Sequence, residues 1–231
     1  MGFNTPEIID FLGPCGFDGA WVECEHGPST WSDLQDLTRA ADLWGLTSLV
    51  RVNQNDPALI GRTLDQGATG IVVPHVNTKE EAQRVVHGAK FSPVGQRGIF
   101  TSRQAIGVDS LTYFREVNDQ ILLVVLIEEM TAIDNLDEIL AVDHIDVFFV
   151  ASGDLAQTMG HVGQPKHPEV KKVVESTMRR IRQAGRNAGT VAGIDEFEYF
   201  TDLGANFVVV SWKPWIVETA KRYVAKVASL K

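Results

Sequence analysis

Two carboxylates follow apolar runs that have the composition of buried strands. Glu128 ends the run "LLVVLIE", and Asp154 comes shortly after the run "VFFVA". The two positions are 26 residues apart, about the length of one strand and one helix with their loops, so adjacent parallel strands would bring both carboxylates to one end of a sheet. Such a pair repels unless a proton or a cation lies between its members. A hard divalent cation is one explanation, and salt-bridged or solvated acids are the other.

Other polar residues follow the remaining apolar runs. Arg51 ends a run that is otherwise apolar, and burying a guanidinium is costly without an anionic partner. A substrate carboxylate, an enolate oxygen or a neighbouring acid would each provide that partner. His26 could exchange protons near neutral pH or hydrogen-bond the loop backbone, and His75 could line the same end of the sheet or serve a loop. The same ends also carry Glu23, Glu25 and Glu129.

Seven short apolar runs must position these side chains. They are predicted to be strands and span residues 20–23, 48–52, 70–74, 122–128, 147–151, 189–192 and 206–211. The stretches between them predict helices, because Asp56 and Pro57 are of the types found at a helix start, and Thr78 is a good cap for the next one. Residues 167–185 repeat their apolar positions with helical spacing.

Strands that are apolar on both faces and alternate with helices are typical of a parallel sheet covered by helices. The number of strands and the recurring helix–Gly–strand junctions favour a (β/α) barrel over an open sheet. We therefore predict one α/β domain, residues 1–231, with the architecture of a TIM-type barrel. Residues 91–107 form the longest irregular stretch and are predicted to be a lid or binding loop, with disorder as the alternative.

The composition excludes several classes of partner. Hydrophobic residues make up 44% of the 231 residues and charged residues 22%, as in a globular protein with a sizeable core. The net charge of -9 would repel phosphate backbones and anionic lipids, so neither nucleic acid nor a membrane is an expected partner. The longest apolar run has seven residues, too few to span a bilayer. No secretory signal is recognisable, and Cys15 and Cys24 make no disulfide framework, so we expect a cytoplasmic protein with reduced cysteines.

The candidate residues stand within a longer series of motifs. In order these are "GFDGAWVECEHGPST", "LVRVNQNDPALIGRTLDQGATGIVVPHV", "FSPVGQRG", "VVLIEEMTAIDNLDEILAV" and "IDVFFVASGDLAQTMGHVGQPKHPEV". Together they resemble the 4-hydroxy-2-oxoheptanedioate aldolase family, a group of metal-dependent class II pyruvate aldolases in the phosphoenolpyruvate/pyruvate barrel superfamily. The resemblance runs from Thr5 to the C-terminus.

This resemblance implies a metal site and a pyruvate site. Glu128 and Asp154 match the carboxylate ligands of a divalent Mg, Mn, Co or Zn cation, whose coordination pyruvate completes. The backbone N–H groups of Gly153 and Asp154 match those that bind the pyruvate carboxylate. A glycine there would let the backbone approach the ligand closely.

The resemblance also implies catalytic roles and an assembly. Arg51 matches the arginine that stabilises the enolate oxygen, and His26 matches the histidine that moves protons through metal-bound water. Asp65 matches a carboxylate that reaches this histidine from a neighbouring subunit. We therefore expect a homo-oligomer, which the family suggests is a hexamer built as a trimer of dimers with exchanged C-terminal helices.

Three departures from the family pattern stand out. Glu23 and Cys24 replace an aspartate–glycine pair before the "EH" motif, and Leu126 replaces a glutamine that hydrogen-bonds pyruvate. The family's first barrel strand precedes the segment aligned with "TPEIIDFLG". We therefore expect a TIM-type (β/α)8 barrel whose first strand is missing or replaced, so that the barrel is incomplete, closed by another element or completed by a neighbouring chain.

The expected function is that of a carbon–carbon lyase. It would form or cleave a 4-hydroxy-2-oxo acid through a metal-bound pyruvate enolate, with a small 2-oxo acid and an aldehyde as partners. Leu126 and Cys24 keep related metal-enolate reactions open: an oxaloacetate-type decarboxylation, a citrate-forming condensation or cleavage of an acyl thioester. A barrel that has lost catalysis and serves in assembly is a third interpretation.

Overall fold

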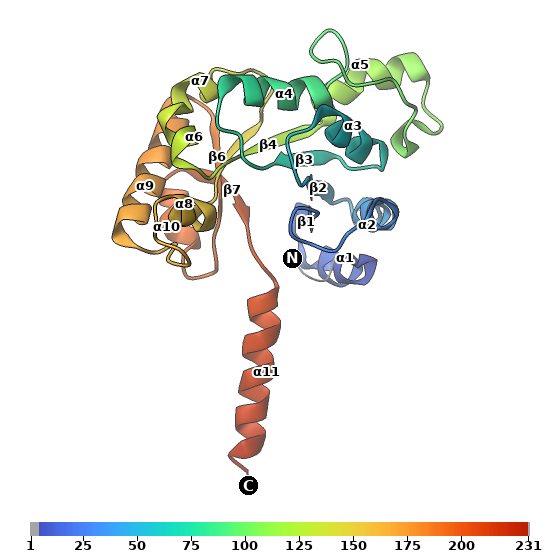
Figure 1. Cartoon of the computed structure of the whole chain (residues 1–231). Coiled ribbons are helices and arrows are strands. Elements are labelled where there is room, and N and C mark those ends of the chain that lie inside the picture. Colours follow the sequence, from blue (N-terminus) through green and yellow to red (C-terminus); the bar gives the residue numbers. More distant parts are fainter. Residues whose placement is uncertain (1–4, 231) are drawn as a thin grey trace.

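Seven parallel strands form one curled sheet in the computed structural model, which describes residues 5–230 (Figure 1). Every predicted strand is present, and each observed end lies within two residues of its predicted position. The strands follow one another around the sheet in chain order. They are β1 (Gly19–Glu23), β2 (Thr47–Arg51), β3 (Gly70–Val73), β4 (Leu122–Ile127), β5 (Val147–Val150), β6 (Asn187–Val191) and β7 (Ala205–Val209).

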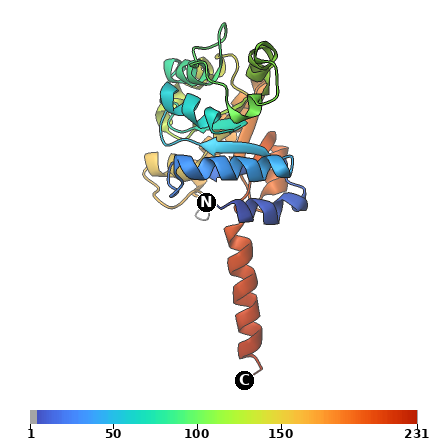
Figure 2. The same cartoon turned by 90° about the vertical axis from the view of Figure 1, so that its right-hand side faces the viewer.

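Helices connect successive strands and cover the outer face of the sheet (Figures 1 and 2). The predicted caps are confirmed: the Asp56 side chain accepts from the N–H of Leu59 at 2.9 Å, and Thr78 forms a capping box with Glu81. The helices are α1 (Pro6–Leu12), α2 (Trp31–Leu43), α3 (Pro57–Asp65), α4 (Lys79–Ala89), α5 (Ser110–Gln120), α6 (Met130–Asp134), α7 (Leu136–Leu140), α8 (Ser152–Thr158), α9 (Pro168–Gln183), α10 (Phe197–Asp202) and α11 (Lys213–Ala228).

The strands are apolar on both faces because each face packs in a different cluster. In β4, Val125 and Ile127 belong to the large cluster between the sheet and its helices. Val124 and Leu126 belong to a smaller cluster inside the curl of the sheet, which also contains Phe149 of β5. Side chains of a strand alternate between its faces, so Glu128, two positions beyond Leu126, continues the inner row.

The strand register brings polar residues to one end of the barrel. Glu23 is the register partner of Arg51, and both are the last residues of their strands. Because all strands run in the same direction, the residues that follow β3, β4 and β5 lie at this same end. The predicted convergence of polar strand ends therefore occurs.

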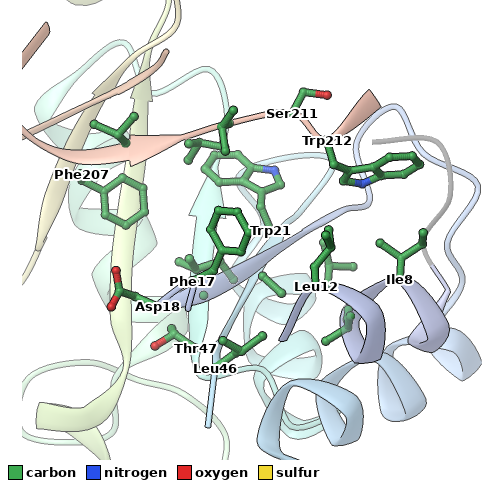
Figure 3. A pocket seen from close by; sticks show the side chains of 18 of the residues that line it. Ile8, Leu12, Phe17, Asp18, Trp21, Leu46, Thr47, Phe207, Ser211 and Trp212 are labelled. Carbon is green, nitrogen blue, oxygen red and sulfur yellow. The ribbon is translucent and has the colours of Figure 1, made fainter. Parts of the chain in front are cut away.

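The sheet is open between β7 and β1. Among residues 5–230, no strand pairs with the free edge of either, so the described chain forms a seven-stranded half-barrel of the TIM type. A cavity of about 350 Å³ lies along this opening, lined by residues of α1, β1, β7 and the start of α11, including Leu12, Trp21, Phe207 and Trp212 (Figure 3). The missing or replaced first strand stays a prediction.

Helix α11 projects away from the barrel (Figures 1 and 2). None of its residues is buried, and its exposed apolar side chains include Ile216, Tyr223 and Val224. At its start, Trp215 stacks on Phe17 with ring centroids 6.1 Å apart. No helix among the described residues is long and apolar enough to cross a membrane.

Residues 91–107 are fixed at the end of the barrel where the strands begin. Arg97 donates to Asp65 at 2.6 Å, and Gln104 donates to the backbone carbonyl of Gly67, which precedes β3. Arg103 pairs with Asp42 at the C-terminal end of α2. The segment therefore lies at the opposite end from the polar strand ends, and the predicted lid does not form over them within this chain.

Candidate active site

A buried arginine between two carboxylates joins β1 to β2. The Nε and Nη2 groups of Arg51 each lie 2.7 Å from Oε2 of Glu23, and Nη1 lies 2.8 Å from Oε2 of Glu25. The side chains of Arg51 and Glu23 are 9% and 2% exposed, so the pair is shielded from water. The anionic partner that we predict for a buried Arg51 is therefore present, and it consists of the neighbouring acids Glu23 and Glu25. A guanidinium has five N–H groups on three nitrogens, and each of these nitrogens lies within ion-pair distance of one of the two acids.

Glu23 also fixes the loop that follows β1. Its Oε1 accepts the backbone N–H groups of Glu25 and His26 at 2.8 and 3.1 Å, and its Oε2 lies 3.4 Å from the indole nitrogen of Trp21. Burial acts to raise the pKa of Glu23, but the hydrogen bond and charge of Arg51, with the two backbone donors, lower it overall. Glu23 is therefore a structural anion that holds Arg51 in place.

His75, at the start of the loop after β3, contacts Glu25 and two further carboxylates. Its backbone has a positive φ of 55°, which is uncommon for a residue with a side chain, and its N–H donates to Oε1 of Glu128 at 2.8 Å. Its ring places Nδ1 2.8 Å from Oε1 of Glu129 and Nε2 3.4 Å from Oε1 of Glu25. Burial acts to lower the pKa of His75, but the surrounding carboxylates raise it overall. The carboxylates thus stabilise the charged form of the ring.

Glu128 is a buried acid with a strongly raised pKa. Its side chain is 2% exposed, and its pKa is raised from the ordinary 4.5 to about 7. Burial is the main cause, the hydrogen bond and charge of His75 oppose it, and the negative charges of Asp154 and Glu25 add to it. Glu128 is therefore a buried acid whose anionic form lacks sufficient compensation.

Asp154 lies in the first turn of α8, immediately after β5. Its side chain is exposed, and among residues 5–230 no hydrogen bond or ion pair engages it. The preceding Gly153 is also exposed, and a Cβ there would meet no atom within 4 Å. The N–H groups of a helix's first turn have no intrahelical acceptor. The turn therefore offers backbone donors and open space beside a carboxylate.

His26 and Asp65 are not joined to one another within this chain. The His26 ring is 66% exposed, and its Nε2 lies 3.7 Å from Oε2 of Glu25 at the edge of the cluster. Asp65 is the last residue of α3, a helix that runs back to the opposite end of the barrel, where Asp65 pairs with Arg97. Asp65 can therefore meet His26 only in another copy of the chain.

The donor set fits a divalent cation. Five carboxylates gather at this end of the barrel, and the described residues around them contribute one guanidinium, from Arg51, and two imidazoles, from His26 and His75. The negative charge is thus only partly neutralised, and the acid with the raised pKa is the one next to the unpartnered Asp154. Carboxylate oxygens are the ligands that hard divalent ions prefer. The five acids are Glu23, Glu25, Glu128, Glu129 and Asp154.

Two replaced positions also lie at this site. Leu126 is 1% exposed and faces the inside of the barrel, directly before Glu128 in the inner row, so this layer of the interior is apolar. Cys24 is partly buried, and burial with the charge of Glu23 raises the pKa of its thiol to about 11. Cys24 is therefore a neutral thiol near pH 7, not an activated nucleophile.

The central positions of Glu25 and His75 could not be recognised from the sequence. In the sequence, Glu25 is one of several acids at a strand end, and His75 is equally well interpreted as a loop residue. The one feature of the sequence that indicates a role for them is their position after an apolar run. The 350 Å³ cavity at the open side of the sheet is a separate feature, since none of the five acids lines it.

Comparisons with known proteins bear on this arrangement. A family model described as HpcH/HpaI aldolase/citrate lyase matches residues 1–213. The 2-keto-3-deoxy-L-rhamnonate aldolase of Escherichia coli (strain K12) is 36% identical over 213 residues, which cover 91% of this chain and 80% of that protein. These names support membership of a broader aldolase family. They do not support the specific 4-hydroxy-2-oxoheptanedioate aldolase that the sequence motifs resemble.

Solved structures agree on the fold. An HpcH/HpaI aldolase/citrate lyase family protein from Burkholderia cenocepacia J2315 is 26% identical and has a TM-score of 0.92, over 99% of this chain and 92% of that chain. The protein CitE from Mycobacterium tuberculosis, solved in complex with magnesium and acetate, is 14% identical with a TM-score of 0.59, over 91% and 82% of the two chains. At that identity the likeness concerns the fold alone.

Replacing Glu128 with glutamine should stabilise the metal-free protein in a pH-dependent way. A pKa raised from 4.5 to about 7 means that the folded chain keeps a proton that the unfolded chain loses, so stability falls as the pH rises through this range. Glu128→Gln removes that loss and should raise the free energy of unfolding by about 1 to 3 kcal/mol at pH 8, with little effect at pH 4. Urea unfolding in the presence of a chelator measures both values.

Glu138→Gln, at an exposed position on α7, is the matched control and should change neither value. An equal effect of Glu128→Gln at both pH values would show that ionisation of Glu128 does not destabilise the folded chain.

Proposed function

The chain belongs to the HpcH/HpaI aldolase/citrate lyase family, and from this premise we propose that it is a divalent-metal-dependent aldolase that forms or cleaves a 4-hydroxy-2-oxo acid. The observation that carries the proposal is the buried Glu128, which has a raised pKa beside the unpartnered Asp154. Two such acids at adjacent strand ends lose their mutual repulsion when a cation binds between them.

Glu128 and Asp154 would bind the cation, which is Mg, Mn, Co or Zn. A bound divalent ion acts as a Lewis acid that stabilises negative charge developing on a keto oxygen. Glu128 directly follows β4, and Asp154 lies in the first turn of α8, which follows β5. Because β4 and β5 are paired neighbours in the sheet, the two ligands come from adjacent strand ends. His75 anchors Glu128 through its backbone N–H and limits the directions that this carboxylate can adopt.

The 2-oxo acid would bind beside the first turn of α8. The backbone N–H groups of Gly153 and Asp154 are the proposed donors to its carboxylate, and the open space at Gly153 accommodates such a ligand. Arg51 would stabilise the enolate oxygen with the N–H groups that Glu23 and Glu25 leave available. The two acids hold the guanidinium in one orientation before substrate arrives, so little reorganisation accompanies the reaction.

His26 is the proposed proton-transfer residue. Its exposed ring at the rim can reach the hydroxyl that derives from the aldehyde, and an imidazole can both accept and donate a proton. Asp65 would orient this ring from another copy of the chain. The neutral thiol of Cys24 takes no part in this scheme, in keeping with its raised pKa.

The chemical class of substrate follows from the reaction type. The relatives are named for 2-keto-3-deoxy-L-rhamnonate, which is itself a 4-hydroxy-2-oxo acid, so the same bond would be cleaved to give pyruvate and an aldehyde. Leu126 favours a second candidate function for the same site, which would keep the metal and the enolate but use another electrophile. The reaction would then be decarboxylation of an oxaloacetate-type acid, a citrate-forming condensation or cleavage of a thioester. An apolar Leu126 offers no hydrogen bond to the substrate at this layer.

We further propose that the active protein is a homo-oligomer, with a hexamer built as a trimer of dimers as the specific form. Three features support an association of copies: α11 leaves the barrel without burying a residue, the sheet is open between β7 and β1, and Asp65 lies far from His26 of its own chain. A single copy exposes apolar side chains on α11 that association would cover.

Removing either proposed ligand should strongly reduce activity without unfolding the chain. With a 4-hydroxy-2-oxo acid as substrate and Mn²⁺ present, Glu128→Gln and Asp154→Asn should each lower kcat/KM about 100-fold or more, because the charge on the keto oxygen would no longer be stabilised. Pyruvate release, coupled to its enzymatic reduction, measures the rate. Parallel assays with oxaloacetate and an acyl thioester distinguish the second candidate.

Asp143→Asn, an exposed change outside the site, is the matched control and should leave the rate unchanged. Full activity of both ligand variants would exclude the proposed site. Absence of metal binding by the native protein would favour the non-catalytic interpretation.

Charges introduced on α11 should weaken the oligomer. Tyr223 and Val224 are 72% and 64% exposed, so Tyr223→Glu with Val224→Glu should not disturb the barrel itself. The native chain should elute as an oligomer in light-scattering chromatography, and the double variant as smaller species, because buried charge at an interface is costly. Lys221→Gln on the same helix is the control. A monomeric native chain at micromolar concentration would contradict the proposal.

A further inference from the structure

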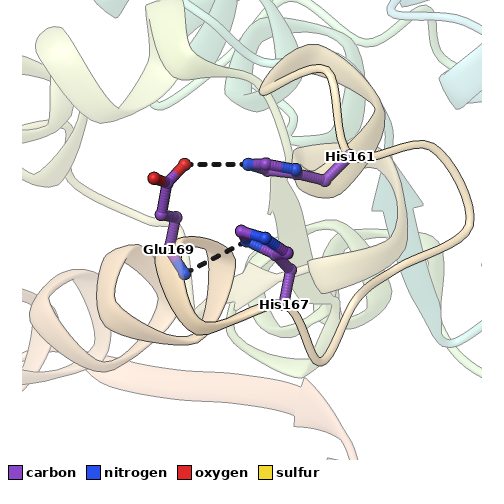
Figure 4. Close-up of side chains that lie close together, drawn as sticks. All are labelled: His161, His167 and Glu169. Atoms are coloured by element: carbon purple, nitrogen blue, oxygen red, sulfur yellow. Dashed lines mark hydrogen bonds and ion pairs between the residues drawn. The ribbon is translucent and has the colours of Figure 1, made fainter.

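The loop between α8 and α9 brings together two histidines and a glutamate (Figure 4). His161 follows the end of α8, His167 is the N-cap of α9, and Glu169 lies in the first turn of that helix. One potential ligand atom from each residue lies within 4.8 Å of the other two. The loop thus gathers two imidazole nitrogens and a carboxylate oxygen on one side.

The three residues already contact one another. The Nε2 atom of His161 lies 2.8 Å from Oε2 of Glu169, and the two imidazole rings stack with centroids 3.6 Å apart at 17°. The Nδ1 atom of His167 accepts the backbone N–H of Glu169 at 3.3 Å. This leaves Nε2 as the nitrogen of His167 that can bind a ligand.

The loop backbone fixes these positions. The N–H of His161 donates to the carbonyl of Ala156 at 2.8 Å, and the N–H of His167 donates to the carbonyl of Gln164 at 2.9 Å. Gly160 and Gly163 have positive φ values of 82° and 72°, which let the chain turn tightly here. The histidines are therefore brought together by the fold of the loop and not by chance contact of mobile side chains.

We propose that His161, His167 and Glu169 form a second metal site, specific for a borderline transition ion such as Zn²⁺, Ni²⁺ or Cu²⁺. Two imidazoles with one carboxylate are typical ligands of these ions, whereas Mg²⁺ prefers oxygen ligands. The proposed ligand atoms of the carboxylate site, from Glu128 and Asp154, are all oxygens, so that site also suits Mg²⁺ and Mn²⁺, which the loop site would bind poorly.

Binding requires small movements of the side chains. Bonds of about 2.0 to 2.2 Å to one Zn²⁺ place tetrahedral ligands roughly 3.4 Å apart, so the three atoms must come closer and the stacked rings must tilt towards the ion. The Glu169 side chain is 71% exposed and that of His161 is 22% exposed, so both have room to turn. The dipole of α9 opposes a cation at its N-terminus by only about 0.3 to 1 kcal/mol, a small effect beside metal–ligand bonds.

The competing explanation is an ion pair between His161 and Glu169, with His167 acting only as a helix cap. That explanation accounts for the hydrogen bonds. It predicts no selectivity among metals, and it gives the Nε2 atom of His167 no role. Metal titration therefore separates the two.

The test is a Zn²⁺ titration of the chelator-treated full chain against a coloured competitor. The native chain should bind one more Zn²⁺ than His161→Ala or His167→Asn, and Glu169→Gln should weaken this extra site about 10-fold or more. Asparagine at position 167 retains a good helix cap, so His167→Asn removes the imidazole without removing the cap. Electron paramagnetic resonance of Mn²⁺, measured in parallel, should show unchanged Mn²⁺ binding in these variants.

His87→Ala, at an exposed position on α4, is the matched control and should keep the full zinc stoichiometry. Equal numbers of Zn²⁺ bound by the native chain and by folded His161→Ala and His167→Asn would overturn the proposal. Equal loss in the His87→Ala control would also overturn it, because zinc would then bind exposed histidines without regard to the loop.

Discussion

An excess of negative charge at one end of the barrel is the constraint on which the rest of the site depends. Arg51 neutralises part of it by pairing with Glu23 and Glu25, which also fixes the guanidinium. Glu128 and the unpartnered Asp154 remain, and burial makes the anionic form of Glu128 unfavourable. A fold that retains such a pair gains no stability from it in the absence of a positive partner. The pair therefore makes sense as a binding site for a cation, and the proposed chemistry follows from it.

The parallel barrel explains how acids far apart in the chain meet. Each strand contributes its last residues to one rim, and the strand pairing sets their order around it. The same architecture places helix ends such as Asp65 at the opposite rim, so its proposed role needs a second copy of the chain. The open side of the sheet and the projecting α11 are consistent with an assembly in which copies complete one another.

Much of the framework could be predicted because it depends on local patterns. The seven strands are short runs of mostly apolar residues, Asp56 and Thr78 are residue types that cap helix starts, and Arg51 ends an apolar strand. The position of His75 could not be predicted, since it depends on a positive φ and on partners more than 50 residues away. The stacking of His161 on His167 likewise depends on the tertiary path of a loop. Residues 91–107 are predicted to be a lid from their irregular sequence alone, because nothing in that sequence indicates which end of the barrel they contact.

The most direct measurement of the central claim is the anomalous scattering of Mn²⁺ in crystals grown with the ion and a pyruvate analogue such as oxalate. We expect one strong peak within about 2.2 Å of carboxylate oxygens of both Glu128 and Asp154, with oxalate on the same ion. Fully occupied crystals in which both carboxylates contact only protein or water, with no peak between them, would contradict it.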